Sequence, residues 1–221
     1  KGVSTHGIAW FPQYVNKDAF QTLRDNYGIN TIRLAMYTNK SEGYGPDAVN
    51  KVREGVKYAT ELGMYVIIDW HILNDGNPNQ HKSEAKNFFT KMSKKYGGQK
   101  NVIYEICNEP NGNVTWNKQI KPYAKTIVKT IRKHSKNAVI VIGTPTWSQD
   151  VDVVAQSPLK GKNLMYALHF YAGTHKEWNQ EKLKTAHKKG LPVMVTEFSI
   201  CDASGNGALD KASGNQWLCL L

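Results

Sequence analysis

The chain has 221 residues, 40% of them hydrophobic and 21% charged, which is enough apolar material for one buried core. No run of about 18 apolar residues occurs, so the sequence excludes a membrane-spanning helix. Lysine and arginine exceed aspartate and glutamate by 29 to 18, but the lysines recur at helical spacings, as on solvated helix faces, and we expect no nucleic-acid or membrane partner.

Short β-branched or aromatic runs alternate with amphipathic stretches, a pattern that favours parallel strands joined by crossover helices. Strands are predicted at residues 5–10, 31–37, 65–71, 102–109, 138–143, 164–171 and 192–198. Helices are predicted between them at residues 19–27, 46–62, 83–96, 117–134, 150–156 and 178–189. Several predicted helices stop at a glycine, which readily adopts the left-handed conformation that ends a helix. These glycines are Gly28, Gly63, Gly97 and Gly190.

Polar and ionisable residues gather at the carboxyl ends of the predicted strands. In a (β/α)8 barrel these ends converge on one rim, which carries the active site. We therefore expect an α/β fold of the (β/α)8, or TIM-type, barrel class, incomplete with seven strands visible, in a single domain of residues 1–221. A doubly wound open sheet is the alternative, but its usual glycine-rich first turn is absent from the segment THGIAWFPQ.

Two glutamates occupy corresponding places at strand ends. In VIYEICNEP a proline directly follows Asn108 and Glu109, and in PVMVTEFS the strand delivers Glu197. Two facing carboxylates on one rim are what glycoside hydrolysis requires. Arg33 lies in the apolar strand TIRLAMY, where a guanidinium is costly without a carboxylate, and we expect its partner to be Glu197.

The segment IYEICNEPNG resembles the signature of glycoside hydrolase family 5, in which an Asn-Glu-Pro triplet ends the fourth strand. The resemblance continues through THGIAWFPQYVNKD, INTIRLAMYT, MYVIIDWHILNDGNPNQ, TPTWSQDV, MYALHFYAGTH and VMVTEFSICDASGNG, which look like segments of the secreted cellulases of that family. It implies an extracellular retaining endo-β-1,4-glucanase that acts on β-1,4-glucan with no cofactor and no metal. It also implies that Glu109 is the acid/base and Glu197 the nucleophile.

The same resemblance implies a set of substrate-binding residues. Asn108 would hydrogen-bond the sugar 2-hydroxyl, and Ala203 would touch the sugar through its backbone. The reacting subsite would be lined by His6, Arg33, His71, His169 and Tyr171, and sugar rings would stack on Trp10, Tyr37 and Trp147. Two alternatives stay open: a mannanase or xylanase of the same family, or a glucan-binding protein with impaired catalysis.

The chain departs from the family pattern at its end and at its cysteines. It stops at NQWLCLL, before an eighth strand, which leaves the edges of the first and seventh strands uncovered. We expect a homo-oligomer that covers this open edge, a tail that packs into it, or a fragment of a longer barrel. Cys201 and Cys219 are the only pair considered for a disulfide, and Cys107 is expected to be a small buried hydrophobe.

Overall fold

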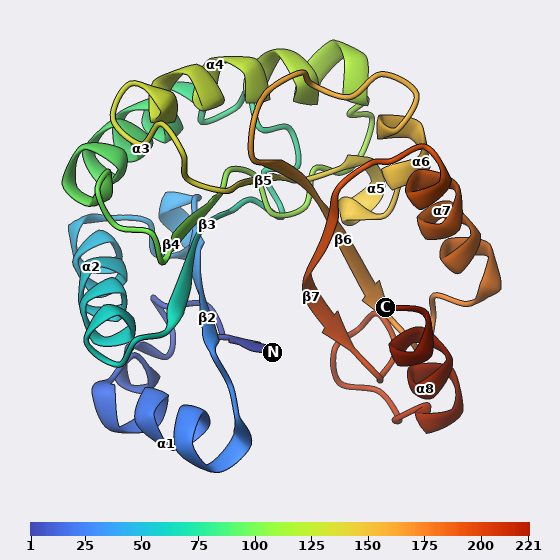
Figure 1. The fold of residues 1–221 in the computed structure, drawn as a ribbon, viewed down its shortest axis with the longest axis horizontal. Helices are drawn as coiled ribbons and strands as arrows, with labels where there is room; N and C mark the ends of the chain where they lie inside the picture. The colour runs from blue at the N-terminus through green and yellow to red at the C-terminus, as the bar shows by residue number, and fades with distance from the viewer.

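The computed structural model describes residues 1–221 and has the predicted barrel architecture with one side open (Figure 1). Seven parallel strands form one curved sheet in which each strand pairs with the next along the chain. They are β1 (Gly2–Ser4), β2 (Thr31–Tyr37), β3 (Tyr65–His71), β4 (Val102–Glu105), β5 (Ile140–Ile142), β6 (Leu164–Tyr171) and β7 (Val193–Ser199). This sequential order confirms the (β/α)8 class, because the order of a doubly wound sheet reverses at a switch point.

Helices surround the sheet on its outer side (Figure 1). The longer ones are α1 (Lys17–Tyr27), α2 (Pro46–Glu61), α3 (Lys82–Tyr96), α4 (Lys121–Arg132), α7 (Glu177–Lys188) and α8 (Lys211–Leu220). Shorter pieces are η1 (Pro12–Tyr14), η2 (Lys40–Glu42), η3 (Trp116–Ile120), α5 (Pro145–Ser148) and α6 (Val151–Val154). Gly28, Gly63 and Gly190 are left-handed as predicted. Gly97 is not: its φ is −59°, and a side chain there would collide with the backbone of His134.

The apolar core lies between the sheet and the helices. On β2 the side chains alternate, so that Ile32, Leu34 and Met36 join the core while Arg33 and Tyr37 face the interior of the barrel. The helices supply the other half of the core from their apolar stripes. Polar side chains are therefore directed into the barrel interior by the same alternation that buries the apolar ones outside it.

Two predicted strands have different bounds in the structure. The first strand covers residues 2–4 rather than 5–10, since Trp10 and Phe11 both donate their backbone N–H to Gly7 O in a tight turn. The fifth strand covers residues 140–142 rather than 138–143. Thr5 and Ile8 still donate backbone hydrogen bonds to β2, so the first segment runs beside its neighbour beyond the regular strand.

β4 also ends earlier than predicted, at Glu105 rather than at residue 109. The following segment remains attached to the end of β3, because Asn108 N donates to Trp70 O over 3.1 Å and Glu109 N donates to Ile72 O over 3.3 Å. The backbone that carries the predicted acid/base is therefore held in place although it is not part of a regular strand.

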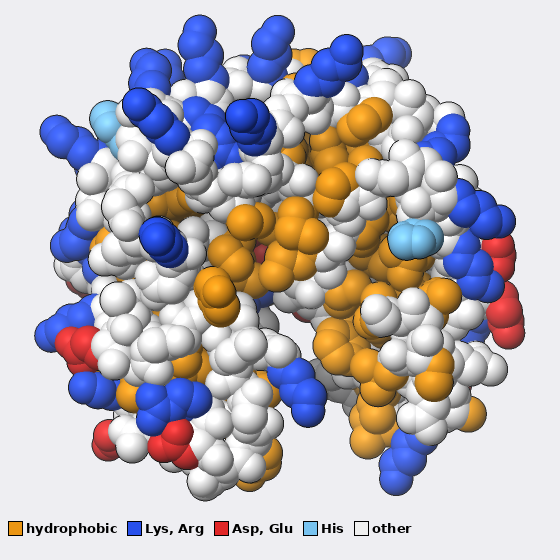
Figure 2. Space-filling model, viewed as in Figure 1, with side chains coloured by type: hydrophobic (Ala, Val, Ile, Leu, Met, Phe, Trp, Pro, Cys, Tyr) orange, Lys and Arg blue, Asp and Glu red, His pale blue; other side chains and the backbone are white.

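β1 and β7 do not pair, so the barrel is open between them, and the surface is notched on that side (Figure 2). α8 does not fill the opening. Trp217 stacks on Phe170, with ring centroids 4.0 Å apart, and its Nε1 donates to His175 O. Phe170 faces outward, since His169 and Tyr171 on either side of it face the interior. The expectation that the tail packs into the gap is wrong, because Trp217 finds an apolar partner on the outer face of β6.

All three cysteines are free thiols. Cys107 is buried, as expected, and so is Cys201, which follows β7 and has its Sγ 3.1 Å from Ser199 Oγ. Cys219 is exposed on α8. The disulfide considered between Cys201 and Cys219 is therefore wrong, since the packing of α8 on β6 leaves the two side chains in different environments.

The basic side chains lie on the outside of the helices. In the view of Figure 2, lysine and arginine gather along the side where α3 and α4 lie, as expected for solvated helix faces. No helix of the structure has the length and apolar character needed to cross a bilayer.

Candidate active site

A cavity of about 1050 Å³ opens at the carboxyl ends of the strands. Most of the predicted site residues line it, namely His6, Tyr37, His71, Glu109, Trp147, His169, Tyr171, Glu197 and Ala203. Arg33 and Asn108 are 2% and 0% exposed and are buried against these lining residues. Trp10 does not line the cavity and packs against Tyr37, with ring centroids 4.6 Å apart. Apart from Trp10, the predicted residues thus come together at one place.

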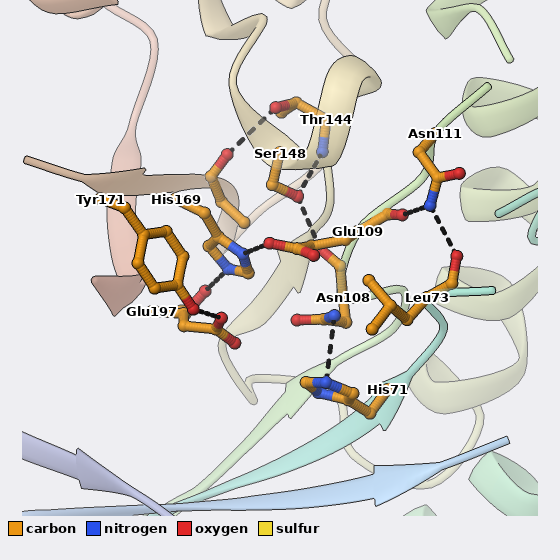
Figure 3. Close-up of polar contacts among 12 residues, drawn as sticks. His71, Leu73, Asn108, Glu109, Asn111, Thr144, Ser148, His169, Tyr171 and Glu197 are labelled. Atoms are coloured by element: carbon orange, nitrogen blue, oxygen red, sulfur yellow. Dashed lines mark hydrogen bonds and ion pairs between the residues drawn. The ribbon is translucent and has the colours of Figure 1, made fainter. Parts of the chain in front are cut away.

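Glu109 follows β4 on a segment that is tied to its neighbour. Asn111 Nδ2 donates to Glu109 O over 2.9 Å and to Leu73 O over 2.6 Å (Figure 3). The Glu109 carboxylate points into the cavity, where its Oε1 lies 2.9 Å from Nδ1 of His169. Its Oε2 forms no hydrogen bond within the protein. One carboxylate oxygen is therefore held, and the other is available to a ligand.

Glu197 lies on β7 at the same cavity. Its Oε1 accepts a hydrogen bond from Tyr171 OH over 2.7 Å, and its Oε2 accepts one from Arg33 Nη1 over 3.1 Å. Burial favours the neutral form of Glu197, but the charges of His169 and Arg33 outweigh burial and hold its pKa at about 2. Glu197 is therefore ionised at neutral pH. Burial and the adjacent Glu197 raise the pKa of Tyr171, which keeps its phenol proton as a donor.

Arg33 connects three carboxylates in the barrel interior. Its guanidinium lies 3.1 Å from Glu197, as predicted, but also 2.8 Å from Glu105 and 3.0 Å from Asp69. Arg33 is 2% exposed, and these carboxylates compensate for its loss of water. Burial alone would lower the pKa of Arg33, yet the surrounding negative charges raise it. The cation is therefore permanent and acts on the whole cluster.

Asn108 and His71 lie next to Arg33. His71 lines the cavity, and Asn108 is buried against it. Asn108 Oδ1 accepts from Arg33 Nη2 over 2.6 Å, and Asn108 Nδ2 donates to Ile72 O and faces His71 Nε2 at 3.3 Å (Figure 3). On the other side of the ring, His71 Nδ1 lies 2.6 Å from Asp69 Oδ2. Every polar group of Asn108 thus has a partner, which fixes the orientation of its amide.

Trp147 reaches the cavity from a strained turn after β5. Thr146, Trp147 and Ser148 have φ of 56°, 54° and 56°, a left-handed conformation that costs non-glycine residues about 1 kcal/mol each. The turn is held by Trp147 N, which donates to Pro110 O, and by Ser148 Oγ, which donates to Asn108 O over 2.6 Å. Backbone strain of this kind is tolerated where it serves to place a functional side chain.

The remaining predicted residues lie at the rim of the cavity. His6 Nδ1 accepts from Gly7 N over 2.7 Å, and its ring makes edge contacts with Trp10 and Phe11. The backbone N–H of Ala203 donates to Thr174 Oγ1 over 2.9 Å, so this N–H is already engaged within the protein.

Four site residues were not predicted from the sequence. Asp69 and Glu105 are ionisable residues in apolar strands, which is the same sequence signal that identified Arg33. In the structure they are its partners. Thr196 gives no sequence signal. His175 also lines the cavity, and its Nδ1 accepts from the backbone N–H of Tyr171 over 2.7 Å.

Glu109, His169 and Glu197 have ligand-type atoms within 4.8 Å of one another, close enough to consider a metal ion. The chemistry of His169 argues against that use. Both ring nitrogens already have partners, in Glu109 and Thr196. Burial would lower the pKa of His169, but the nearby carboxylates of Glu105 and Glu109 raise it to about 10. A protonated ring has no lone pair for a metal, so the arrangement favours acid–base chemistry.

The chain matches a family model described as cellulase (glycosyl hydrolase family 5) over residues 1–221. An endoglucanase of Clostridium saccharobutylicum is 49% identical over 99% of this chain and 49% of that protein. Endoglucanase 5 of Pectobacterium carotovorum subsp. carotovorum is 49% identical over 100% of this chain and 44% of that protein. The chain therefore spans about half the length of the curated relatives it matches.

Solved structures agree with these relatives. Cellulase Cel5C_n superposes with a TM-score of 0.95 at 42% identity, covering 99% of this chain and 71% of that chain. The catalytic domain of Thermobifida fusca endoglucanase Cel5A superposes with a TM-score of 0.94 at 35% identity, covering 100% of this chain and 74% of that chain. By sequence, by fold and by the match along its whole length, the chain belongs to the cellulase family, glycosyl hydrolase family 5.

Proposed function

We propose that this protein is a retaining endo-β-1,4-glucanase with Glu109 as acid/base and Glu197 as nucleophile. The observation that carries the proposal is the separation of the two carboxylates, which have oxygens within 4.8 Å of each other across one cavity. A separation of roughly 5 Å suits a covalent glycosyl-enzyme, whereas an inverting mechanism needs roughly 6.5 Å or more to admit a water.

In the first step, Glu197 attacks the anomeric carbon of the sugar and the glycosidic bond breaks. Arg33 and Tyr171 keep Glu197 ionised and oriented for this attack through one hydrogen bond to each of its oxygens. Glu109 gives a proton to the departing glycosidic oxygen, so that a neutral alcohol leaves. Its Oε2, which has no partner in the protein, is the oxygen suited to deliver that proton.

In the second step, Glu109 is a carboxylate and takes a proton from an incoming water. The water oxygen attacks the anomeric carbon, and the bond to Glu197 breaks. Glu197 leaves as a carboxylate, which its contact with Arg33 stabilises. Two inversions at the same carbon restore the original configuration.

The cavity also offers groups for the substrate. Tyr37 and Trp147 line it, and Trp147 is 45% exposed, as needed for stacking on the apolar face of a sugar. Trp10 is 46% exposed beside Tyr37 and would extend this aromatic surface outward. Asn108 stays our proposed partner for the sugar 2-hydroxyl, through the Nδ2 hydrogen that faces His71 Nε2 at 3.3 Å. His6 and His71 complete the reacting subsite.

The proposed substrate is β-1,4-glucan. A variant of the Thermobifida fusca enzyme, 34% identical to this chain, has been solved in complex with cellotetraose. Because cellulose is a polymer too large to enter a cell, we propose that the protein acts outside the cell as a secreted enzyme. Glucan binding with impaired catalysis is the second candidate, and the open side between β1 and β7 is the observation that favours it.

Release of reducing ends from carboxymethyl-cellulose, mannan and xylan tests the proposal. We expect hydrolysis of the glucan by the wild type and none by Glu109→Gln or Glu197→Gln. Hydrolysis of mannan or xylan alone would show that this polysaccharide, and not β-1,4-glucan, is the substrate. Binding of the glucan by the wild type without release of reducing ends would show that the protein is a glucan-binding protein and not an enzyme.

A further inference from the structure

Strand β7 contains a bulge that changes which of its side chains face the barrel interior. The pairing with β6 shifts after Leu168, so that His169 pairs with Glu197 and Thr196 becomes an extra residue. In a regular strand Thr196 would face away from Glu197. Here both side chains point inward, and the Thr196 hydroxyl lies 2.8 Å from Glu105 Oε1 and 2.8 Å from His169 Nε2.

The hydroxyl of Thr196 has one hydrogen to donate, and its neighbours decide where that hydrogen points. Glu105 is 0% exposed, and its Oε2 accepts from Arg33 Nε over 2.8 Å. An ionised carboxylate only accepts, so the Thr196 hydrogen goes to Glu105 Oε1. The Thr196 oxygen can then only accept from His169, which requires a hydrogen on Nε2 of that ring.

The other nitrogen of His169, Nδ1, lies 2.9 Å from Oε1 of Glu109. We propose that Glu105 and Thr196 are positioning residues for Glu109: they keep His169 as a cation whose Nδ1–H binds Oε1 of Glu109. This inference rests on the proposed role of Glu109 as acid/base. Neither Glu105 nor Thr196 lines the cavity, so both act through His169.

The consequence is that the two oxygens of Glu109 have different tasks. With Oε1 occupied by the N–H of His169, the transferable proton of Glu109 is confined to Oε2. In the first step the Oε2–H bond breaks and the proton passes to the leaving oxygen. In the second step a proton from water returns to Oε2. The His169 cation keeps its own protons throughout and stabilises the carboxylate between the two steps.

The charges around His169 favour this assignment. Glu109 and Glu105 lie 2.9 and 3.6 Å from the ring nitrogens of His169. The other titratable and charged groups of the site are Arg33, Asp69, His71, Tyr171, His175 and Glu197, which are linked to one another by hydrogen bonds and ion pairs. Carboxylates outnumber the permanent cation in this group, so a second positive charge on His169 is compensated. In the same direction, the nearby carboxylates of Glu105 and Glu109 outweigh burial and raise the pKa of His169 to about 10.

The first test uses Thr196→Val, which removes the hydroxyl at nearly constant shape, and two substrates. 2,4-Dinitrophenyl β-cellobioside has a leaving group that needs no proton, whereas cellotetraose needs one. We expect kcat/KM to fall about tenfold or more on cellotetraose and less than about twofold on the dinitrophenyl substrate. Equal losses on both substrates, or no loss on either, would overturn the inference.

Two variants serve as controls. Thr196→Ser keeps the hydroxyl and is expected to retain most of the activity on cellotetraose; a loss equal to that of the valine variant would count against a role for the hydroxyl. Thr130→Val removes another buried hydroxyl, on α4, whose hydrogen bond goes to Thr126 O in its own helix. It is expected to leave the hydrolysis of both substrates unaffected, which separates the role of the Thr196 hydroxyl from a general loss of stability.

A second measurement needs no variant to be active. Long-range 1H–15N NMR of the imidazole rings at pH 7 reports which nitrogens carry hydrogens, and His169→Gln identifies the relevant signals. We expect both nitrogens of His169 to be protonated. A signal showing either ring nitrogen of His169 without a hydrogen would overturn the inference, whatever the kinetics. If the wild type cleaves neither substrate, the proposed function fails, and the NMR result still decides whether His169 is a cation.

Discussion

Arg33 and Glu197 are 164 residues apart in sequence, and Nη1 of the arginine donates to Oε2 of the glutamate over 3.1 Å. This contact helps to hold the pKa of Glu197 at about 2, against the effect of burial. Because that pKa is depressed, Glu197 stays ionised down to low pH. If Glu197 is the nucleophile, as proposed, the acidic limb of a pH profile of kcat/KM reports its protonation.

Arg33→Met is expected to move that acidic limb to higher pH, since the proposed nucleophile Glu197 loses a cation that favours its charged form. It is also expected to destabilise the fold by about 3 kcal/mol, because Asp69 and Glu105 are left buried without their partner. Arg33→Lys keeps the charge and is expected to shift the limb less. An acidic limb that stays in place in the methionine variant would show that Arg33 acts only on the fold.

Glu109→Gln and Glu197→Gln are each expected to lower kcat by several orders of magnitude on a soluble β-glucan, because no neighbouring group can replace either step. Azide added to Glu197→Ala is expected to give an α-glycosyl azide, since azide enters from the face that the nucleophile occupied. A β product would exchange the roles of the two glutamates. Product configuration is read by NMR.

The pH dependence of stability is expected to carry opposite signatures from His169 and Glu197. The pKa of His169 rises from 6.5 to about 10 on folding, so its stabilising contribution is complete below pH 6.5 and is lost as the pH rises toward 10. The pKa of Glu197 falls from 4.5 to about 2, so its contribution is complete above pH 4.5 and is lost toward pH 2.

Denaturant unfolding at a series of pH values measures both contributions. His169→Gln is expected to flatten the alkaline side of the stability curve, and Glu197→Gln the acidic side. An alkaline slope unchanged in His169→Gln would mean that the ring gains no proton on folding.

The free cysteines predict a simple labelling pattern. In the native protein one thiol, that of Cys219, is expected to react rapidly with Ellman's reagent, and all three are expected to react after denaturation. Cys107 and Cys201 are buried, and burial also raises the pKa of Cys107, which disfavours its reactive thiolate. If only one thiol reacts in the denatured, non-reduced protein, two of the three cysteines form a disulfide after all.

The open edges of β1 and β7 predict that the polypeptide of residues 1–221 self-associates. Val3 and Phe198, 36% and 46% exposed, are apolar side chains on these two strands. Phe198→Lys is expected to shift the mass measured by light scattering toward the monomer, whereas Tyr27→Lys, on α1, is not. A monomeric wild type at all concentrations would remove homo-oligomer formation as the way this edge is covered.

The sequence by itself determined the elements and most of the rim. The strands at residues 31–37, 65–71 and 164–171 were predicted with the bounds that the structure has, because continuous β-branched and aromatic runs buried on both faces have few other conformations. The ends of parallel strands meet at one rim whatever the details of packing. That rule is enough to predict that Glu109, His169 and Glu197 line one cavity, as they do.

Only the tertiary structure decided which hydrogen bonds and packing contacts connect those groups. The bulge that turns Thr196 inward and the left-handed turn under Trp147 leave no pattern in the local sequence, since both are stabilised by partners distant in the chain. The local sequence also does not show that Glu105 pairs with Arg33. Nor does it show that Trp217 packs on the outer face of β6 and not in the open edge. Hydrogen bonds and aromatic stacking act over a few ångströms in space, so they are set by which elements pack together and not by the order of residues along the chain.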